Sequence, residues 1–283
     1  MKIVHTMPLL IRGEFSYEDD LRMAKTCFES LRASEDCLVV LYNQGCLCND
    51  DLRGILTSYG LSAVILGHGE NIGIARARQT CFEYIWEHCG DVEYISEIHV
   101  DMVFPPNWHV PLVDYLASSD EPMISPGIVT MYGELQPISE EIAIPDNAAA
   151  LIALLGDLNR EEIREGFVHP VVHKASILRE IGGYDTRFLR GKQGYEDDSL
   201  LLGYLYYMGT RSNWRPKCYL KSWVYHATMA QRMSLPDKHL EFALNEEGLI
   251  RQYGAYGLKR LSIIHRNPSA FETLLQEILQ QYR

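Results

Sequence analysis

The sequence contains three consecutive carboxylates, Glu196, Asp197 and Asp198, between a Gly-Tyr pair and a run of three leucines. Adjacent carboxylates repel one another, so such clusters commonly bind a metal, orient a hydroxyl group or accept a proton. The alternative is an acidic helix N-terminus, where carboxylates interact favourably with the positive end of the helix dipole. Both interpretations remain open on these residues alone.

A second group of residues suited to metal binding follows an apolar segment. His99 and Asp101 are separated by one residue at the end of a strand predicted over 93–100. Since side chains alternate along a strand, we expect both to lie on the same face at its carboxyl end. An imidazole nitrogen and a carboxylate oxygen can both bind a divalent cation. Alternatively, Asp101 only caps the following turn.

The elements that would position these residues alternate between apolar strands and helices. The predicted helices cover 17–31, 50–59 and 74–88, and the predicted strands begin at 3–4 and continue at 37–42, 63–66 and 93–100. Continuous apolar strands separated by helices are typical of a parallel sheet covered on both faces, which predicts an α/β fold. Ligands of such sheets bind at the carboxyl ends of the strands.

The later part of the chain departs from this alternation. Residues 137–167 are polar at first and then strongly helical, which predicts a helical insertion or lid. Strands near 171–172 and 219–226 and helices over 174–181 and 199–208 follow. Without a repeat or a low-complexity linker, we expect one domain over residues 1–230, with residues 231–283 as a C-terminal helical extension packed on it.

Composition is that of a globular protein, with 47% hydrophobic and 23% charged residues. The net charge of −12 argues against nucleic acid as the main partner, although it permits a small phosphate-bearing ligand. The seven cysteines are odd in number and scattered, as expected for reduced thiols in a cytoplasmic protein. We expect no signal peptide and no transmembrane segment, because the chain starts with a strand and lacks an apolar run of ~20 residues.

Four motifs, in this order, resemble the family 2-like glycosyltransferases of the GT-A fold. They are Asn71-x-Gly73 running to Arg78, then His99-x-Asp101 running on to Pro105-Pro106-x-Trp108, then Gly182-Gly183-Tyr184-Asp185-x-x-Phe188, and finally Glu196-Asp197. The resemblance covers about residues 1–230 and implies a Rossmann-like, mostly parallel central sheet flanked by helices. Two residues depart from the pattern: His99 replaces the first Asp of Asp-x-Asp, and Gln79 replaces an Asn.

The resemblance implies a site for a nucleotide sugar at the carboxyl ends of the first four strands, with a divalent metal bridging the two phosphates. The implied nucleotide-binding residues are Met7, Pro8, Asn43, Arg78, His99 and Asp101. The implied metal ligands are Asp101, His226 and His99, and the histidines favour Mn²⁺ over Mg²⁺. Two alternatives remain open: His226 as a hydrogen-bonded core histidine, and Arg78 as a surface arginine.

The resemblance also assigns residues to the transfer step. Asp197 would deprotonate the acceptor hydroxyl, and Glu196 would hold a sugar by hydrogen bonds. Asp198 is either a second candidate base or a helix-start acid. Aromatic rings can stack on sugars or belong to the core, and the candidate rings are Tyr195, Trp108, Trp214 and Tyr132.

The implied activity is that of a hexosyltransferase-type glycosyltransferase (EC 2.4). It would move a sugar from a nucleotide-diphosphate donor, with a UDP-sugar favoured, to a hydroxyl of a carbohydrate, lipid-linked or peptide acceptor. The reaction would be inverting and metal-dependent, and the enzyme would be cytoplasmic or peripheral at a membrane. The alternatives are a retaining transferase, a non-catalytic glycan-binding protein, and a nucleotidyltransferase. The last would need a glycine-rich loop after the first strand, where residues 8–13 contain a single glycine.

Overall fold

The computed structural model describes residues 2–34, 37–209, 212–227, 237–267, 269 and 271–281. The strands in this part of the chain are β1 (Ile3–Leu9), β2 (Leu38–Asn43), β3 (Ser62–Leu66), β4 (Tyr94–Glu97), β5 (Met102–Val103), β6 (Met123–Thr130), β7 (Glu134–Gln136), β8 (Glu140–Glu141), β9 (Ile163–Glu165), β10 (Val171–Lys174) and β11 (Lys217–His226). The helices are α1 (Tyr17–Leu31), α2 (Asn49–Ser58), α3 (Ile74–His88), α4 (Val110–Ala117), α5 (Ala148–Asp157), α6 (Ala175–Ile181), α7 (Glu196–Met208), α8 (Lys238–Ile264) and α9 (Glu272–Gln281), with a short 3₁₀ turn at Glu14–Ser16.

The central sheet has the order β3-β2-β1-β4-β10-β6-β11-β5. β1 to β4 pair in parallel, β10 runs antiparallel to both of its neighbours, and β6 and β11 again pair in parallel. The carboxyl ends of β1, β2, β4, β6 and β11 therefore lie along one edge of the sheet. This edge is where a mostly parallel sheet binds ligands.

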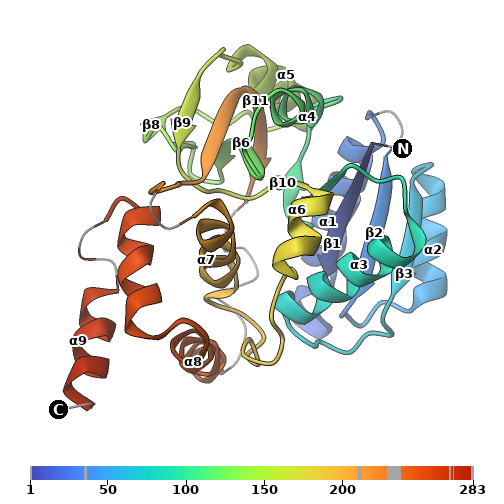
Figure 1. Cartoon of the computed structure of the whole chain (residues 1–283). Coiled ribbons are helices and arrows are strands. Elements are labelled where there is room, and N and C mark those ends of the chain that lie inside the picture. Colours follow the sequence, from blue (N-terminus) through green and yellow to red (C-terminus); the bar gives the residue numbers. More distant parts are fainter. Residues whose placement is uncertain are drawn as a thin grey trace.

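Helices cover both faces of the sheet because its strands are apolar on both sides (Figure 1). Along β1, Ile3 and Met7 belong to the hydrophobic cluster formed with α1, α2, α4 and α5, whereas Val4 belongs to the cluster formed with α3, α6, α7 and α8. This alternation is the period-two pattern of a strand buried on both faces. The α/β fold class and the helices predicted over 17–31 and 74–88 are confirmed.

The segment 137–167 is less purely helical than its sequence suggests. It contains α5, whose Leu151 and Leu155 are buried, but also β8 and β9. β9 pairs antiparallel with β11, so the segment is joined to the sheet by backbone hydrogen bonds at its end. These strands could not be predicted from hydrophobic periodicity, because β8 and β9 are short and consist mainly of polar residues.

The C-terminal residues form a separate layer on the α7 side of the fold. Figure 1 shows α7 and α8 side by side, with α9 next to α8. Gly254 has a φ of 62° and interrupts the helical backbone within α8. None of the helices in the described ranges is long and apolar enough to cross a membrane.

Gly127 tests the packing between β6 and β11, the strand that ends in His226. A Cβ atom at Gly127 would lie 2.6 Å from the Trp223 ring, which is 1% exposed. We expect Gly127→Ala to lower the free energy of unfolding by about 1–3 kcal/mol, because a closely packed ring cannot move aside without strain. Gly54→Ala in α2 is the control, since its Cβ would meet nothing within 4 Å and should stabilise the helix by about 0.5–1 kcal/mol. Urea denaturation measures both, and an unchanged midpoint for Gly127→Ala would contradict this packing.

Candidate active site

A cavity with a volume of about 350 Å³ opens at the carboxyl edge of the sheet. It receives side chains from β1, from the segments after β2 and β4, from the start of α7 and from the end of β11. The site residues predicted from sequence that line it are Pro8, Arg78, His99, Asp101, Glu196, Asp197 and His226. Residues as far apart in the sequence as Pro8 and His226 thus meet in one cavity.

Three of these residues form a group able to hold a cation. Ligand atoms of His99, Asp101 and His226 all lie within 4.8 Å of one another, and His226 Nε2 is 3.4 Å from Asp101 Oδ1. Among the residues that the structure describes, His99 Nε2 and His226 Nδ1 have no hydrogen-bond partner. Burial and the positive charges of neighbouring residues hold the pKa of His99 well below its usual value. The neutral imidazole that results is the form that binds metals.

The turn after β4 brings His99 and Asp101 together. The prediction of a strand through residue 100 was wrong at its end, because β4 stops at Glu97 and the chain turns at 100–101 to enter β5. β5 pairs antiparallel with the end of β11, and the Ala227 N–H donates to the Asp101 carbonyl at 2.9 Å. The proximity of His99, Asp101 and His226 therefore comes from this turn and its pairing with β11, not from strand alternation.

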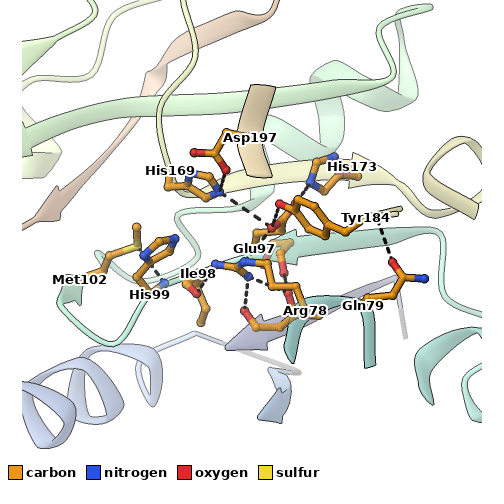
Figure 2. A network of polar contacts seen from close by, with 12 residues as sticks. Arg78, Gln79, Glu97, Ile98, His99, Met102, His169, His173, Tyr184 and Asp197 are labelled. Carbon is orange, nitrogen blue, oxygen red and sulfur yellow. Dashed lines mark hydrogen bonds and ion pairs between the residues drawn. The ribbon is translucent and has the colours of Figure 1, made fainter. Parts of the chain in front are cut away.

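A buried ion pair lies beneath the cavity. Arg78 Nε and Glu97 Oε2 are 2.8 Å apart, and both side chains are almost fully buried. Arg78 also donates to the Thr6 carbonyl at 3.2 Å and to the Ile98 carbonyl at 3.0 Å (Figure 2). The surface alternative for Arg78 is excluded, because its guanidinium is bound inside the fold, where it joins α3 to β1 and to the end of β4.

Glu97 is the centre of the polar network in Figure 2. Its carboxylate is 2.8 Å from His173 Nε2 and accepts a 2.7 Å hydrogen bond from the Tyr184 hydroxyl. The Tyr204 hydroxyl extends the network to His173 Nδ1 at 2.7 Å. Burial alone would raise the pKa of Glu97, but the charge of Arg78 and the hydrogen bond from His173 hold it well below the usual value. The carboxylate is therefore ionised in the folded protein.

His169 connects this network to the acidic pair. Its Nε2 lies 3.8 Å from Asp197 Oδ1 and 3.9 Å from Glu97 Oε2 (Figure 2). Its ring centroid is 4.7 Å from that of His99. A single imidazole thus separates the candidate base from the candidate metal ligands.

The acidic triplet occupies the first turn of α7. Glu196 and Asp197 line the cavity, whereas Asp198 bonds His265 at 2.7 Å, on the side of α8. The helix-start interpretation therefore describes the position of all three acids. Only Glu196 and Asp197 line the cavity, and this distinguishes them from Asp198.

Several residues proposed from sequence lie outside the cavity lining, for reasons of packing. Met7 is fully buried in the core because alternate residues of β1 face the α1 layer. Asn43 shapes the loop after β2 by bonding the Gly45 N–H at 3.1 Å and the Leu47 carbonyl at 2.8 Å, and the neighbouring Gln44 lines the cavity instead.

The aromatic candidates also lie outside the lining. Trp108 packs in the core with a ring centroid 4.9 Å from that of Phe104, and Trp214 is buried with its Nε1 donating to Glu121 at 2.9 Å. The Tyr195 hydroxyl donates to Glu246 at 2.7 Å, and Tyr132 is 82% exposed on a turn.

Sequence reasoning missed Glu97, His169 and His173, as well as Gln193 in the lining. A carboxylate at the end of the apolar strand β4 was the available signal for Glu97. Gln193 is 2% exposed, and its side-chain amide has no hydrogen-bond partner within the described residues. A single histidine or glutamine carries no periodicity, so no pattern in the sequence indicates these positions.

No protein-family model matches the sequence, and no match is found among curated proteins. Solved structures of TarS from S. aureus do match. The TarS structure has a TM-score of 0.55 over 93% of this chain at 9% identity, and the chain spans 42% of TarS. TarS 1-349 in complex with UDP has a TM-score of 0.54 at 10% identity, and the match covers 93% of this chain and 70% of that chain. The complex of TarS 1-349 with UDP-GlcNAc has a TM-score of 0.52 at 10% identity, and the match covers 99% of this chain and 88% of that chain.

This similarity confirms the predicted fold class. The chain shares its α/β fold, a mostly parallel sheet flanked by helices, with the TarS structures.

Glu97→Gln tests the buried ion pair. Removing the carboxylate leaves the Arg78 charge uncompensated inside the protein, so we expect the free energy of unfolding at pH 7 to fall by about 3–5 kcal/mol. Because the pKa of Glu97 is lowered by folding, its stabilisation is present above the unfolded pKa of about 4.3 and is lost as the pH falls further. Urea denaturation between pH 3 and 7 should show that the variant lacks this part of the acid dependence. Arg78→Met combined with Glu97→Gln should cost less than the sum of the single changes, and simple additivity would contradict direct pairing.

Proposed function

We propose that the protein is an inverting, divalent-metal-dependent glycosyltransferase that uses a nucleotide-diphosphate sugar, with a UDP-sugar as the favoured donor. The observation that supports it is that one cavity holds both the His99, Asp101 and His226 group and the Glu196–Asp197 pair. Structures of TarS, which share the fold, contain UDP and UDP-GlcNAc, and this favours uridine.

The charges of the cavity support the proposed requirement for a cation. Asp101, Glu196 and Asp197 line it, and the charge of Arg78 is compensated by Glu97. A diphosphate would be repelled by these carboxylates, and Lys192 adds only one exposed positive charge at the lining. His99, Asp101 and His226 suit a divalent ion of borderline softness such as Mn²⁺. When bound, such an ion would neutralise the diphosphate leaving group.

The remaining lining suits the other parts of a donor. We assign the nucleoside to the region of Pro8, Gln44 and Asn71, which offers an apolar ring and two amides at the ends of β1, β2 and the loop before α3. Gln193 and Glu196, which precede Asp197 by four residues and one residue, would hold sugar hydroxyls. This arrangement orders the donor along the edge of the sheet, from the base to the transferred sugar.

In the transfer step, the acceptor oxygen forms a bond to the anomeric carbon while the bond from that carbon to the phosphate oxygen breaks. The proton of the acceptor hydroxyl passes to the Asp197 carboxylate, and the nucleoside diphosphate leaves with the electron pair. A carboxylate suffices because the hydroxyl becomes acidic late in the reaction. His169, 3.8 Å from Asp197, helps to fix the position of that carboxylate.

Asp197→Asn tests the assignment of the base. The amide keeps the size of the side chain but cannot accept the proton, so turnover should fall by about 10²–10⁴-fold with nucleotide affinity unchanged. Asp198→Asn is the matched control, because Asp198 lies outside the cavity lining and should retain most of the activity. Release of UDP from a panel of UDP-sugars measures turnover, and wild-type rates for Asp197→Asn would rule out this residue as the base.

Calorimetric titration of UDP, GDP and TDP tests the donor site. With Mn²⁺ present we expect one nucleotide to bind, and with EDTA its affinity should fall by about tenfold or more, because the carboxylates then repel the phosphates. Asp101→Ala should reproduce the effect of EDTA. Equal affinity with and without chelator would remove the metal from the proposal, and no binding of any nucleotide would refute the donor site.

A further inference from the structure

The loop that precedes α7 is bonded directly to the C-terminal helix α8. Asn245 is fully buried, and its Oδ1 accepts the Gly191 N–H at 2.6 Å. Its Nδ2 donates to the Gly194 carbonyl at 2.8 Å and to the Gly191 carbonyl at 3.3 Å. One side chain thus fixes both ends of the four-residue segment 191–194, which leads into Glu196 and Asp197.

The two backbones are also in close contact, which only glycine permits. A Cβ atom at Gly191 would lie 2.1 Å from the Glu241 carbonyl oxygen, and one at Gly248 would lie 2.1 Å from the Phe188 carbonyl oxygen. At Gly194 the Cβ would meet the Phe242 ring at 2.7 Å. At Gly191 and Gly248 the two segments therefore meet backbone to backbone, and at Gly194 the loop backbone packs against the Phe242 ring.

Further hydrogen bonds attach α8 on either side of the acidic pair. Before the pair, the Lys192 N–H donates to Glu241 Oε2 at 2.7 Å, next to the Asn245 bonds. After it, the Tyr253 hydroxyl donates to the Ser199 carbonyl at 3.0 Å. Glu196 and Asp197 lie between these attachment points and line the cavity.

We propose that Asn245 is a positioning residue for the Glu196–Asp197 pair, and that α8 is part of the machinery of the site. This inference rests on the proposed transferase function. Asn245 is not part of the cavity lining and acts through the loop, which also presents Lys192 and Gln193 to the cavity. A displacement of the base by about 1 Å can reduce a transfer rate about 100-fold.

Asn245→Ala tests the inference against a purely structural role. The matched control is Leu258→Ala, which removes a fully buried side chain from the same helix at a position without hydrogen bonds to the loop. Three quantities are compared in both variants and in the wild type: amide hydrogen exchange of the peptide 189–199, the dissociation constant and stoichiometry for UDP with Mn²⁺, and the rate of UDP release from UDP-sugars.

For Asn245→Ala we expect faster exchange in the loop, UDP binding within about twofold of wild type at full stoichiometry, and turnover reduced about 100-fold. For Leu258→Ala we expect a lower unfolding midpoint but wild-type exchange in the loop and turnover within a few-fold. Unchanged exchange in Asn245→Ala, unchanged turnover, or an equal loss of turnover in Leu258→Ala would each overturn the inference. If the wild type binds no nucleotide and releases no UDP, the proposed function fails, and loop exchange alone then decides whether Asn245 holds the loop.

Discussion

The ion pair between Arg78 and Glu97 joins several of the elements that lie beneath the cavity. It connects α3 to β4, and the other contacts of the two residues reach β1, β10 and the turn that contains Tyr184. Two charges taken out of water are stable only when nearly every donor and acceptor is satisfied. In this polar layer beneath the cavity, the surrounding histidine and tyrosine side chains bond the Glu97 carboxylate and so meet much of this requirement. His169 lies next to this layer, with its Nε2 3.9 Å from Glu97 Oε2 and 3.8 Å from Asp197 Oδ1.

This layer explains which features the sequence could predict. The helices over 17–31 and 74–88 follow from local periodicity, and the strands of the N-terminal half follow from continuous apolar runs. The Glu97 network could not be predicted in this way, because its bonds join residues 76 and 87 positions apart. Each partner alone resembles an ordinary core residue. The same limit applies to Trp108 and Trp214, whose burial is decided by tertiary packing rather than by their neighbours in the chain.

The candidate site shows a second limit on what can be predicted from the sequence. The proximity of His99 and Asp101 was expected from strand alternation, but a turn after β4 produces it. Both the motif resemblance and the argument from strand alternation pointed to His99 and Asp101. The strand argument, however, assumed an extended backbone where the chain makes a turn. Conversely, the resemblance placed Met7, Pro8 and Asn43 near a nucleotide, while the cavity is lined by Pro8 and by Gln44, the neighbour of Asn43. Family patterns identify a short stretch of chain more securely than the side chain within it that faces the ligand.

The attachment of the 191–194 loop to α8 has a consequence for the order in which the protein assembles. During synthesis, the strands β1 to β4 can pair as soon as β4 has emerged, since their parallel contacts all lie within the N-terminal part of the chain. The loop before α7 acquires its hydrogen-bonded partner about fifty residues later, when Asn245 is added. The cavity is therefore completed only after the sheet that supports it, and a chain that stops near residue 230 would lack the helix that holds Glu196 and Asp197 in place.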